Sequence, residues 1–213
     1  MEKRLKKILE ILKKDYPYAK TALTHKNPLE LLIATILSAQ CTDKRVNIVT
    51  KKLFKKYRSA GDYGDANLND FEKDIYSCGF YRNKAKNIIN ACAIIEQKFN
   101  SKVPKDFNEL LKLPGVARKT ANCIMGNAYD IASGVIVDTH VIRLSQRLGI
   151  SKNKNADKIE QDLIKQIPQN EWISFSHRII DHGRKICDAR KPKCEICSLN
   201  KLCPSAFKIS LRN

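Results

Sequence analysis

The sequence predicts an all-α protein, and three observations support that prediction. Apolar residues recur at intervals of three and four along most of the chain, which is the spacing of a helix with one buried face. No segment alternates apolar and polar residues with the period of two that a half-buried strand requires. Two apolar segments follow a helix-start signal in which Asn or Asp is followed three residues later by Glu. The 213 residues are enough for one large domain or two small ones.

Residues 1–14 predict a surface helix packed on a core. Four apolar residues fall on one face of this helix, and lysines fall on the other. Acidic residues interrupt the basic face, so docking on protein is favoured over binding to a membrane surface. The apolar positions are Leu5, Ile8, Leu9 and Leu12.

Residues 27–37 predict the central helix of a domain. Asn27 is a suitable N-cap, Pro28 fits the first helical position, and Glu30 completes the start signal. Residues 31–37 are apolar on nearly all sides, so we expect this helix to be buried.

Shorter amphipathic segments predict the remaining helices. Three of them follow an aspartate suited to cap a helix N-terminus. They are expected near residues 43–54 with Asp43 as cap, 68–76, 87–99, 106–111 with Asp106 as cap, 118–125, 138–144 with Asp138 as cap, 159–167 and 172–180.

The most informative stretch of the chain runs from residue 113 to residue 143. Pro114 ends one helix, and Gly115 supplies a left-handed conformation and a bare backbone that an anion can approach. The next helix begins near Arg118, and the positive end of its dipole faces the same place. A backbone phosphate therefore fits at this turn. An ordinary helical hairpin is the alternative.

Lys119 and Asp138 are the candidate catalytic residues. A lysine is a nucleophile only when it is neutral, and the positive helix end and Arg118 both favour the neutral amine of Lys119. A carboxylate held rigidly as an N-cap, as expected for Asp138, is also placed to stabilise a cation. The alternatives are a solvated lysine and a simple cap.

The net charge favours a polyanionic partner. The chain has 40 Lys and Arg against 22 Asp and Glu, which gives a formal charge of +18. No apolar run approaches the roughly 20 residues that span a bilayer, and the first residues do not resemble a signal peptide. We therefore expect a soluble, cytoplasmic protein that binds nucleic acid rather than membrane.

Two further places suit contact with an opened duplex. Gln40 follows the buried helix, where its long amide side chain can occupy the gap left by an extruded base; a surface amide is the alternative. The turn at residues 78–85 combines aromatic and cationic residues, among them Phe80 and Lys84, a mixture that stacks on bases and neutralises phosphates. A buried Phe80 is the alternative there.

The eight cysteines fall into two groups. Four are scattered in helical segments and are expected to be small buried hydrophobes: Cys41, Cys78, Cys92 and Cys123. The other four lie within seventeen residues, and such clustering in an intracellular protein indicates metal more often than disulfides. Zinc and a [4Fe–4S] cluster both suit four thiolates, but the presence of one close pair rather than two favours iron–sulfur. These ligands are Cys187, Cys194, Cys197 and Cys203.

Three cations lie between the first two of these cysteines. Arg190, Lys191 and Lys193 flank Pro192, which stiffens the loop. A metal-bound loop of this kind presents cations to DNA phosphates; a solvated charge run is the alternative.

Several motifs together resemble those of one protein family. LPGVARKTA resembles the helix-hairpin-helix DNA-binding signature, and VDTH follows it with its aspartate nineteen residues after the lysine. With SAQCTD and the cysteine spacing C-x6-C-x2-C-x5-C, the chain resembles the endonuclease III family of DNA glycosylases over nearly its whole length. The resemblance implies the helix-hairpin-helix DNA glycosylase fold, with a six-helix barrel domain at residues 22–132. A discontinuous helical domain, residues 1–21 and 133–213, carries the cluster.

The resemblance also implies a function. It predicts a bifunctional DNA N-glycosylase and AP lyase of base-excision repair that excises oxidised or damaged pyrimidines and cleaves 3′ to the abasic site by β-elimination. Lys119 is the implied nucleophile, Asp138 its acidic partner, and a [4Fe–4S] cluster the cofactor. We expect a nucleoid-associated monomer that binds double-stranded DNA containing a damaged base or an abasic site. The expected DNA contacts are Gln40, Phe80, Lys84, Gly115, Val116, Ala117, Thr120, Arg190, Lys191 and Lys193.

Two residues depart from the family's pattern, and two other functions stay open. Ala117 stands where the family has glycine, so its methyl group is expected either to strain the hairpin or to hold the phosphate slightly farther off, and in both cases to weaken DNA binding; Phe80 stands where leucine is usual. A monofunctional adenine or mismatch glycosylase is one alternative, but such enzymes lack the lysine and use an acidic residue that residues 31–41 do not contain. A non-catalytic DNA-binding module is the other.

Overall fold

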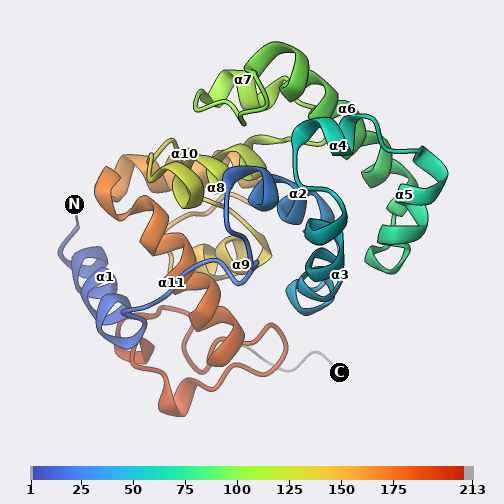
Figure 1. Cartoon of the computed structure of the whole chain (residues 1–213). Helices are drawn as coiled ribbons and strands as arrows, with labels where there is room; N and C mark the ends of the chain where they lie inside the picture. Colours follow the sequence, from blue (N-terminus) through green and yellow to red (C-terminus); the bar gives the residue numbers. More distant parts are fainter. Residues whose placement is uncertain (1, 209–213) are drawn as a thin grey trace. The chain divides into compact units, whose positions relative to one another are not determined.

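The computed structural model describes residues 2–208, and over that range it contains eleven α-helices, four short 3₁₀ helices and no strand (Figure 1). The prediction of an all-α protein is therefore confirmed. The chain divides into two compact units: a central unit of residues 21–133, and a terminal unit that joins residues 1–20 to residues 134–213. In the described range, no helix combines the length and the apolar character that crossing a membrane requires.

The central unit is helical throughout and surrounds one hydrophobic core. Its elements are α2 (Pro28–Ser38), α3 (Asp43–Lys56), α4 (Ala60–Gly64), α5 (Leu68–Ile75), η1 (Tyr76–Cys78), α6 (Tyr81–Phe99), α7 (Phe107–Leu111) and α8 (Arg118–Tyr129).

Helix α2 is the centre of this core, as its composition predicts. Asn27 caps the helix because its side-chain oxygen accepts a hydrogen bond from the Glu30 N–H at 2.9 Å, and Pro28 occupies the first turn. Most residues of α2 are buried, and the helix packs against α3, α6 and α8. The hairpin helix α8 is thereby anchored to the middle of the unit.

Two helix starts differ in detail from the prediction. The N-cap of α3 is Thr42, and Asp43 is the first helical residue, where its negative charge still favours the helix dipole. Asp106 caps α7 as predicted, accepting from the Glu109 N–H at 2.9 Å. The Glu109 side chain pairs with Lys112 at 2.7 Å instead of completing a capping box.

The terminal unit has its own core. Figure 1 shows α11 lying between α1 and α9, and α11 packs against both. The apolar face predicted for the N-terminal helix is buried in this core, which confirms that prediction. The elements of the unit are α1 (Lys3–Asp15), α9 (Thr139–Arg147), α10 (Ala156–Gln166), η2 (Gln169–Glu171), α11 (Trp172–Lys185), η3 (Cys194–Ile196) and η4 (Asn200–Leu202).

Candidate active site and cluster loop

The turn between α7 and α8 exposes its backbone to solvent. The Val116 N–H donates to the Leu113 carbonyl at 3.1 Å, and Gly115 within this turn has φ +78°. The N-cap of α8 is Ala117, whose side chain accepts no hydrogen bond. The N–H groups of the first helical turn lack acceptors inside the helix, so this end of α8 suits an anion. Gly115 and Ala117 are exposed, Thr120 is half-buried, and Val116 is buried.

Gly115 and Ala117 differ in what the backbone demands of them. A Cβ added to Gly115 would lie 3.0 Å from the Cβ and 3.1 Å from the Nδ2 of Asn87, so both the positive φ and the close approach of α6 require glycine. Ala117 has φ −92° and ψ 172°, an extended conformation that alanine adopts freely. The expectation that its methyl group strains the hairpin is therefore wrong.

Lys119 is an exposed residue in the first turn of α8. Its neighbour Arg118 lies over the Phe107 ring, 5.1 Å from the centroid, which holds α8 against α7. One turn further along, the Cys123 Sγ contacts the Thr35 Oγ1 of α2 at 3.8 Å. Burial raises the pKa of the Cys123 thiol, and the positive charge of Lys119 opposes that rise. The candidate nucleophile therefore stands on a helix fixed from two sides.

Asp138 is the N-cap of α9, as predicted. Its Oδ1 accepts from the N–H groups of His140 at 2.8 Å and Val141 at 2.9 Å, and neither bond uses Oδ2. The buried segment before it is held in place, because the Ile136 N–H donates to the Ser176 hydroxyl of α11 at 3.0 Å. The half-buried carboxylate of Asp138 is therefore rigidly placed, with one oxygen left for another partner.

Gln40 and Phe80 are both exposed and both adopt the left-handed backbone conformation. Their φ angles are +51° and +46°, and Phe80 is 65% exposed, which excludes the alternative of a buried ring. A non-glycine residue in this conformation costs about 1–3 kcal/mol, and such residues cluster at functional sites. Both side chains are therefore accessible from solvent.

Lys84 does not take the place that the sequence suggested. It is buried, and its ammonium donates to the carbonyl oxygens of Leu37 and Cys78, both at 2.8 Å. Burial lowers the pKa of Lys84, and the nearby thiols of Cys41 and Cys78 oppose that effect. The prediction of a phosphate contact is thus contradicted: Lys84 holds the end of α2 against η1.

The four clustered cysteines line one cavity in the terminal unit. Its other walls include the apolar side chains of Leu144, Leu148 and Leu199. All eight cysteines lie in the described range, and none forms a disulfide. The four thiols at this cavity are those of Cys187, Cys194, Cys197 and Cys203.

The donors around this cavity fit an iron–sulfur cluster. Four thiols around one apolar cavity suit four iron atoms that each take one thiolate ligand.

Two arginines of α9 that sequence reasoning missed hold the start of the cluster loop. Arg147 donates to the Cys187 Sγ at 3.2 Å and to the carbonyl oxygens of Asp188 at 2.7 Å and Ala189 at 2.6 Å. Arg143 donates to the Cys187 carbonyl at 2.9 Å. Their spacing of four residues, which places both on one helix face, was the available signal.

A histidine of α11, His182, also lines the cavity without having been predicted. Its Nε2 lies 3.5 Å from the Cys197 Sγ, and its Nδ1 lies 3.1 Å from the hydroxyl of Tyr16, the residue that follows α1. The N-terminal helix thus reaches the cluster loop through this histidine.

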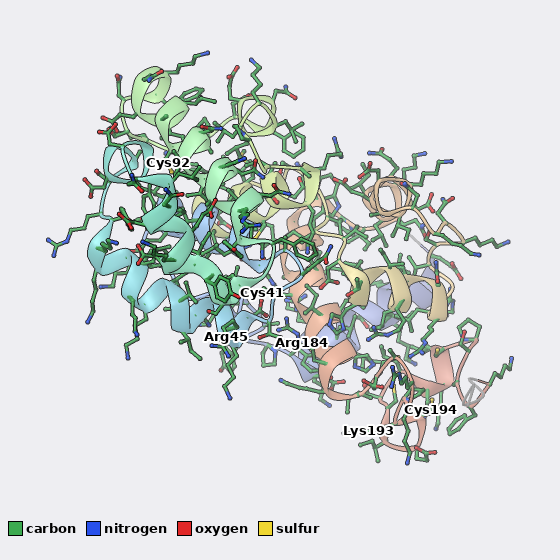
Figure 2. The ribbon with its side chains drawn as sticks, turned by 90° about the vertical axis from the view of Figure 1, so that its right-hand side faces the viewer. Cys41, Arg45, Cys92, Arg184, Lys193 and Cys194 are labelled. Carbon is green, nitrogen blue, oxygen red and sulfur yellow. The ribbon has the colours of Figure 1, made fainter. Side chains whose placement is uncertain are left out.

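The cations predicted between the first two ligands are exposed. The Asp188 carboxylate accepts from the backbone N–H groups of Arg190 at 2.8 Å and Lys191 at 3.1 Å. The Lys193 N–H donates to the Ile186 carbonyl at 3.0 Å, and Figure 2 shows Lys193 next to Cys194 on this loop. The backbone is therefore fixed while the cationic side chains face solvent.

Comparisons with known proteins agree with this architecture. Residues 33–169 match the model of the HhH-GPD superfamily of base excision DNA repair proteins, and residues 187–203 match the iron–sulfur binding domain of endonuclease III. An endonuclease III of Synechocystis sp. is 54% identical over 205 residues, covering 96% of this chain and 94% of that protein. The endonuclease III of Bacillus subtilis is 45% identical over 194 residues, with 91% and 88% covered.

Solved structures give the same result. A non-covalent endonuclease III–DNA complex superimposes with a TM-score of 0.92 at 46% identity, covering 98% of each chain. A trapped endonuclease III–DNA covalent intermediate gives the same TM-score and identity, covering 98% of this chain and 99% of that one.

The fold and the site define a helix-hairpin-helix protein of base-excision DNA repair. The chain belongs to the endonuclease III family. The expected fold class, the [4Fe–4S] cofactor rather than zinc, and the enzyme class of DNA glycosylase and AP lyase are confirmed.

Proposed function

We propose that this chain excises oxidised or damaged pyrimidines from double-stranded DNA and cleaves 3′ to the abasic site, with Lys119 as nucleophile and Asp138 as its acidic partner. The observation that carries the assignment is the position of Lys119. It is exposed in the first turn of α8, next to a hairpin whose exposed backbone and helix dipole suit a phosphate.

DNA binding is assigned to three groups of residues. The hairpin, through Gly115, Val116, Ala117 and Thr120, takes one backbone phosphate at the α8 N-terminus. The exposed cations Arg190, Lys191 and Lys193 neutralise further phosphates. A damaged nucleotide must leave the stack before its sugar is reached, and damage lowers the cost of that step. The exposed Gln40 and Phe80 occupy and wedge the space it leaves.

One amine accounts for both chemical steps. The neutral Lys119 Nζ attacks the sugar C1′, and the bond from C1′ to the base breaks with the electron pair leaving on the base. The nitrogen then loses one proton, and the C1′–O4′ bond breaks with its electron pair on O4′, which takes up a proton; the product is a protonated Schiff base. This imine withdraws electrons, so a proton is lost from C2′ and the 3′ phosphate departs by β-elimination. Asp138 helps deprotonate the lysine and stabilises the positive charge that develops.

The cluster has a structural part in this proposal. When it is bound to Cys187, Cys194, Cys197 and Cys203, it fixes the loop that carries the cations.

We also propose domain bounds, an oligomeric state and a location in the cell. The six-helix barrel domain is assigned to residues 22–132 and the cluster domain to residues 1–21 and 133–213, in line with the two compact units. One chain carries both the nucleophile and its acidic partner, so we propose a monomer. Its DNA substrate places it in the cytoplasm at the nucleoid, with no membrane partner.

Borohydride trapping on a duplex with a single abasic site tests the nucleophile. The cluster-loaded native protein should give a covalent protein–DNA adduct, and Lys119→Gln should give none while still binding the duplex. Lys112→Gln, which changes an exposed lysine of the same hairpin, should still give the adduct. No adduct from native protein that binds the duplex would refute the Schiff-base mechanism.

Two substitutions separate the catalytic role of Asp138 from its capping role. Asp138→Asn keeps an oxygen that can accept from His140 and Val141, so thermal stability should stay near native while base release and strand cleavage fall. Asp138→Ala removes the cap as well and should lower stability by about 0.5–2 kcal/mol. Native rates of base release and cleavage in Asp138→Asn would show that the residue is only a cap.

A further inference from the structure

Cys41 and Cys78 are neighbouring thiols at the base of two exposed residues. Cys41 directly follows Gln40, and Cys78 precedes Phe80 by two residues. The Cys41 thiol is close enough to the Cys78 thiol to raise its pKa. Cys78 is 1% exposed, whereas Cys41 is only partly buried, so a reagent reaches the pair through Cys41.

The backbone holds this pair in register. The Lys84 ammonium donates to the carbonyl oxygens of Leu37 and Cys78 at 2.8 Å each, so the two oxygens lie no farther apart than twice that distance. The Cys41 N–H donates to the Ser38 carbonyl at 3.1 Å, which fixes Cys41 just beyond the end of α2. Both thiols are therefore attached to segments that Lys84 holds together.

The surroundings give the two thiols different reactivity. Burial raises the pKa of the Cys78 thiol to about 11, so this thiol stays protonated at neutral pH. The positive charges of Lys84 and Arg45 act in the opposite direction and stabilise a Cys78 thiolate when it forms. Figure 2 shows Cys41 and Arg45 in the same part of the central unit, with Cys92 well separated from them.

We propose that Cys41 and Cys78 are a reversible oxidation site that a low-molecular-weight disulfide converts to an intramolecular disulfide. The Cys41 thiolate attacks one sulfur of the reagent, its S–S bond breaks, and one reagent thiol leaves. Cys78 then loses its proton and attacks the Cys41 sulfur of the mixed disulfide, which releases the second reagent thiol. Two protein thiols and one reagent disulfide thus become one protein disulfide and two reagent thiols.

The consequence for DNA binding rests on the proposed function. A covalent bond between Cys41 and Cys78 joins the segments that carry Gln40 and Phe80, so the two side chains no longer move independently as a duplex opens. Oxidation then weakens binding to an abasic duplex, and reduction restores it. Disulfides in intracellular proteins are usually transient and regulatory, which matches a site of this kind.

Mass spectrometry tests the chemistry without any DNA. Cluster-loaded protein is treated anaerobically with glutathione disulfide, quenched in acid, alkylated after denaturation and digested. The expected product is a peptide pair joined through Cys41 and Cys78, with no glutathione attached. In Cys78→Ser, Cys41 should instead retain glutathione. Cys92→Ser removes a buried thiol outside the pair and should behave as native.

Two results would overturn the site itself. Stable glutathione on Cys41 of the native protein would show that Cys78 does not resolve the mixed disulfide. The absence of any modification, with visible absorbance confirming an intact cluster, would show that the pair is not oxidised.

An affinity measurement tests the consequence. Oxidised native protein should bind an abasic duplex several-fold more weakly than reduced protein, dithiothreitol should reverse the change, and Cys78→Ser should show no such dependence. Equal affinity of the oxidised and reduced forms would refute the consequence. Failure of the reduced native protein to bind would count against the proposed function. The mass-spectrometry result would still hold, because it is obtained without DNA.

Discussion

Replacing Gly115 by alanine should destabilise the hairpin for two reasons. Gly115 has φ +78°, a value that residues with a side chain rarely adopt. A Cβ at this position would also lie 3.0 Å from the Cβ and 3.1 Å from the Nδ2 of Asn87. The substitution therefore carries a conformational cost and a crowding cost.

The two costs can be estimated separately. A positive φ costs alanine about 1–2 kcal/mol. Crowding against the Asn87 side chain of α6 adds about 1–3 kcal/mol. Each kcal/mol lowers the melting temperature of a chain of this size by about 2–4 °C, so Gly115→Ala should melt measurably below the native protein.

Circular dichroism melts of cluster-loaded protein measure this difference. Affinity for an abasic duplex should also fall in Gly115→Ala, since the turn itself moves. Adding Asn87→Gly removes the crowding atoms, and its own helix cost of about 1 kcal/mol cancels in the double-mutant cycle. A native melting temperature for Gly115→Ala, or no coupling with Asn87→Gly, would refute the reasoning.

Three other substitutions test buried groups. Lys84→Met leaves two carbonyl oxygens without their donor and should lower the free energy of unfolding by about 2–5 kcal/mol in urea titrations; a change below 1 kcal/mol would contradict this. Arg147→Met removes a donor to the Cys187 sulfur, so a chelator should bleach the cluster faster than in native protein. An equal rate of bleaching would show that Arg147 does not stabilise the cluster. Burial lowers the pKa of His177, so as the pH falls this histidine is protonated in the unfolded state before it is protonated in the native state. The free energy of unfolding therefore decreases as the pH drops below about 6.5. His177→Gln should flatten this acid limb in melts at pH 4.5–7 (about the range of the ordinary histidine pKa).

Local signals in the sequence predicted local structure well. The cap at Asn27 and the cap at Asp138 were both found because a side-chain oxygen and the backbone it serves lie within three residues. The apolar face of α1 was equally visible in its spacing. The cysteine spacing indicated for the same reason that the four thiols lie together, because only six, two and five residues separate consecutive cysteines.

Features that depend on tertiary contact were not visible. Lys84 lies in a polar stretch of sequence, and only the folded chain shows that the carbonyls of Leu37 and Cys78 meet at its ammonium. The left-handed conformations of Gln40 and Phe80 likewise leave no mark in composition. Arg147 contacts residues forty positions away, so its four-residue spacing from Arg143 indicates a shared helix face but not the loop that this face contacts.

The high positive charge is therefore a less direct measure of DNA contact than it first suggests. The donors of Lys84, Arg143 and Arg147 are directed at carbonyl oxygens, and Arg178 is paired with Glu171 at 2.6 Å. Except in the Arg178–Glu171 pair, these contacts use hydrogen bonds without neutralising charge, so the cations still contribute to the long-range field that attracts a polyanion. Exposed cations such as Arg190 and Lys193 contribute to this field and are also accessible to phosphates. Substituting a buried cation should thus change stability first and the salt dependence of DNA binding only slightly, whereas substituting an exposed one should do the reverse.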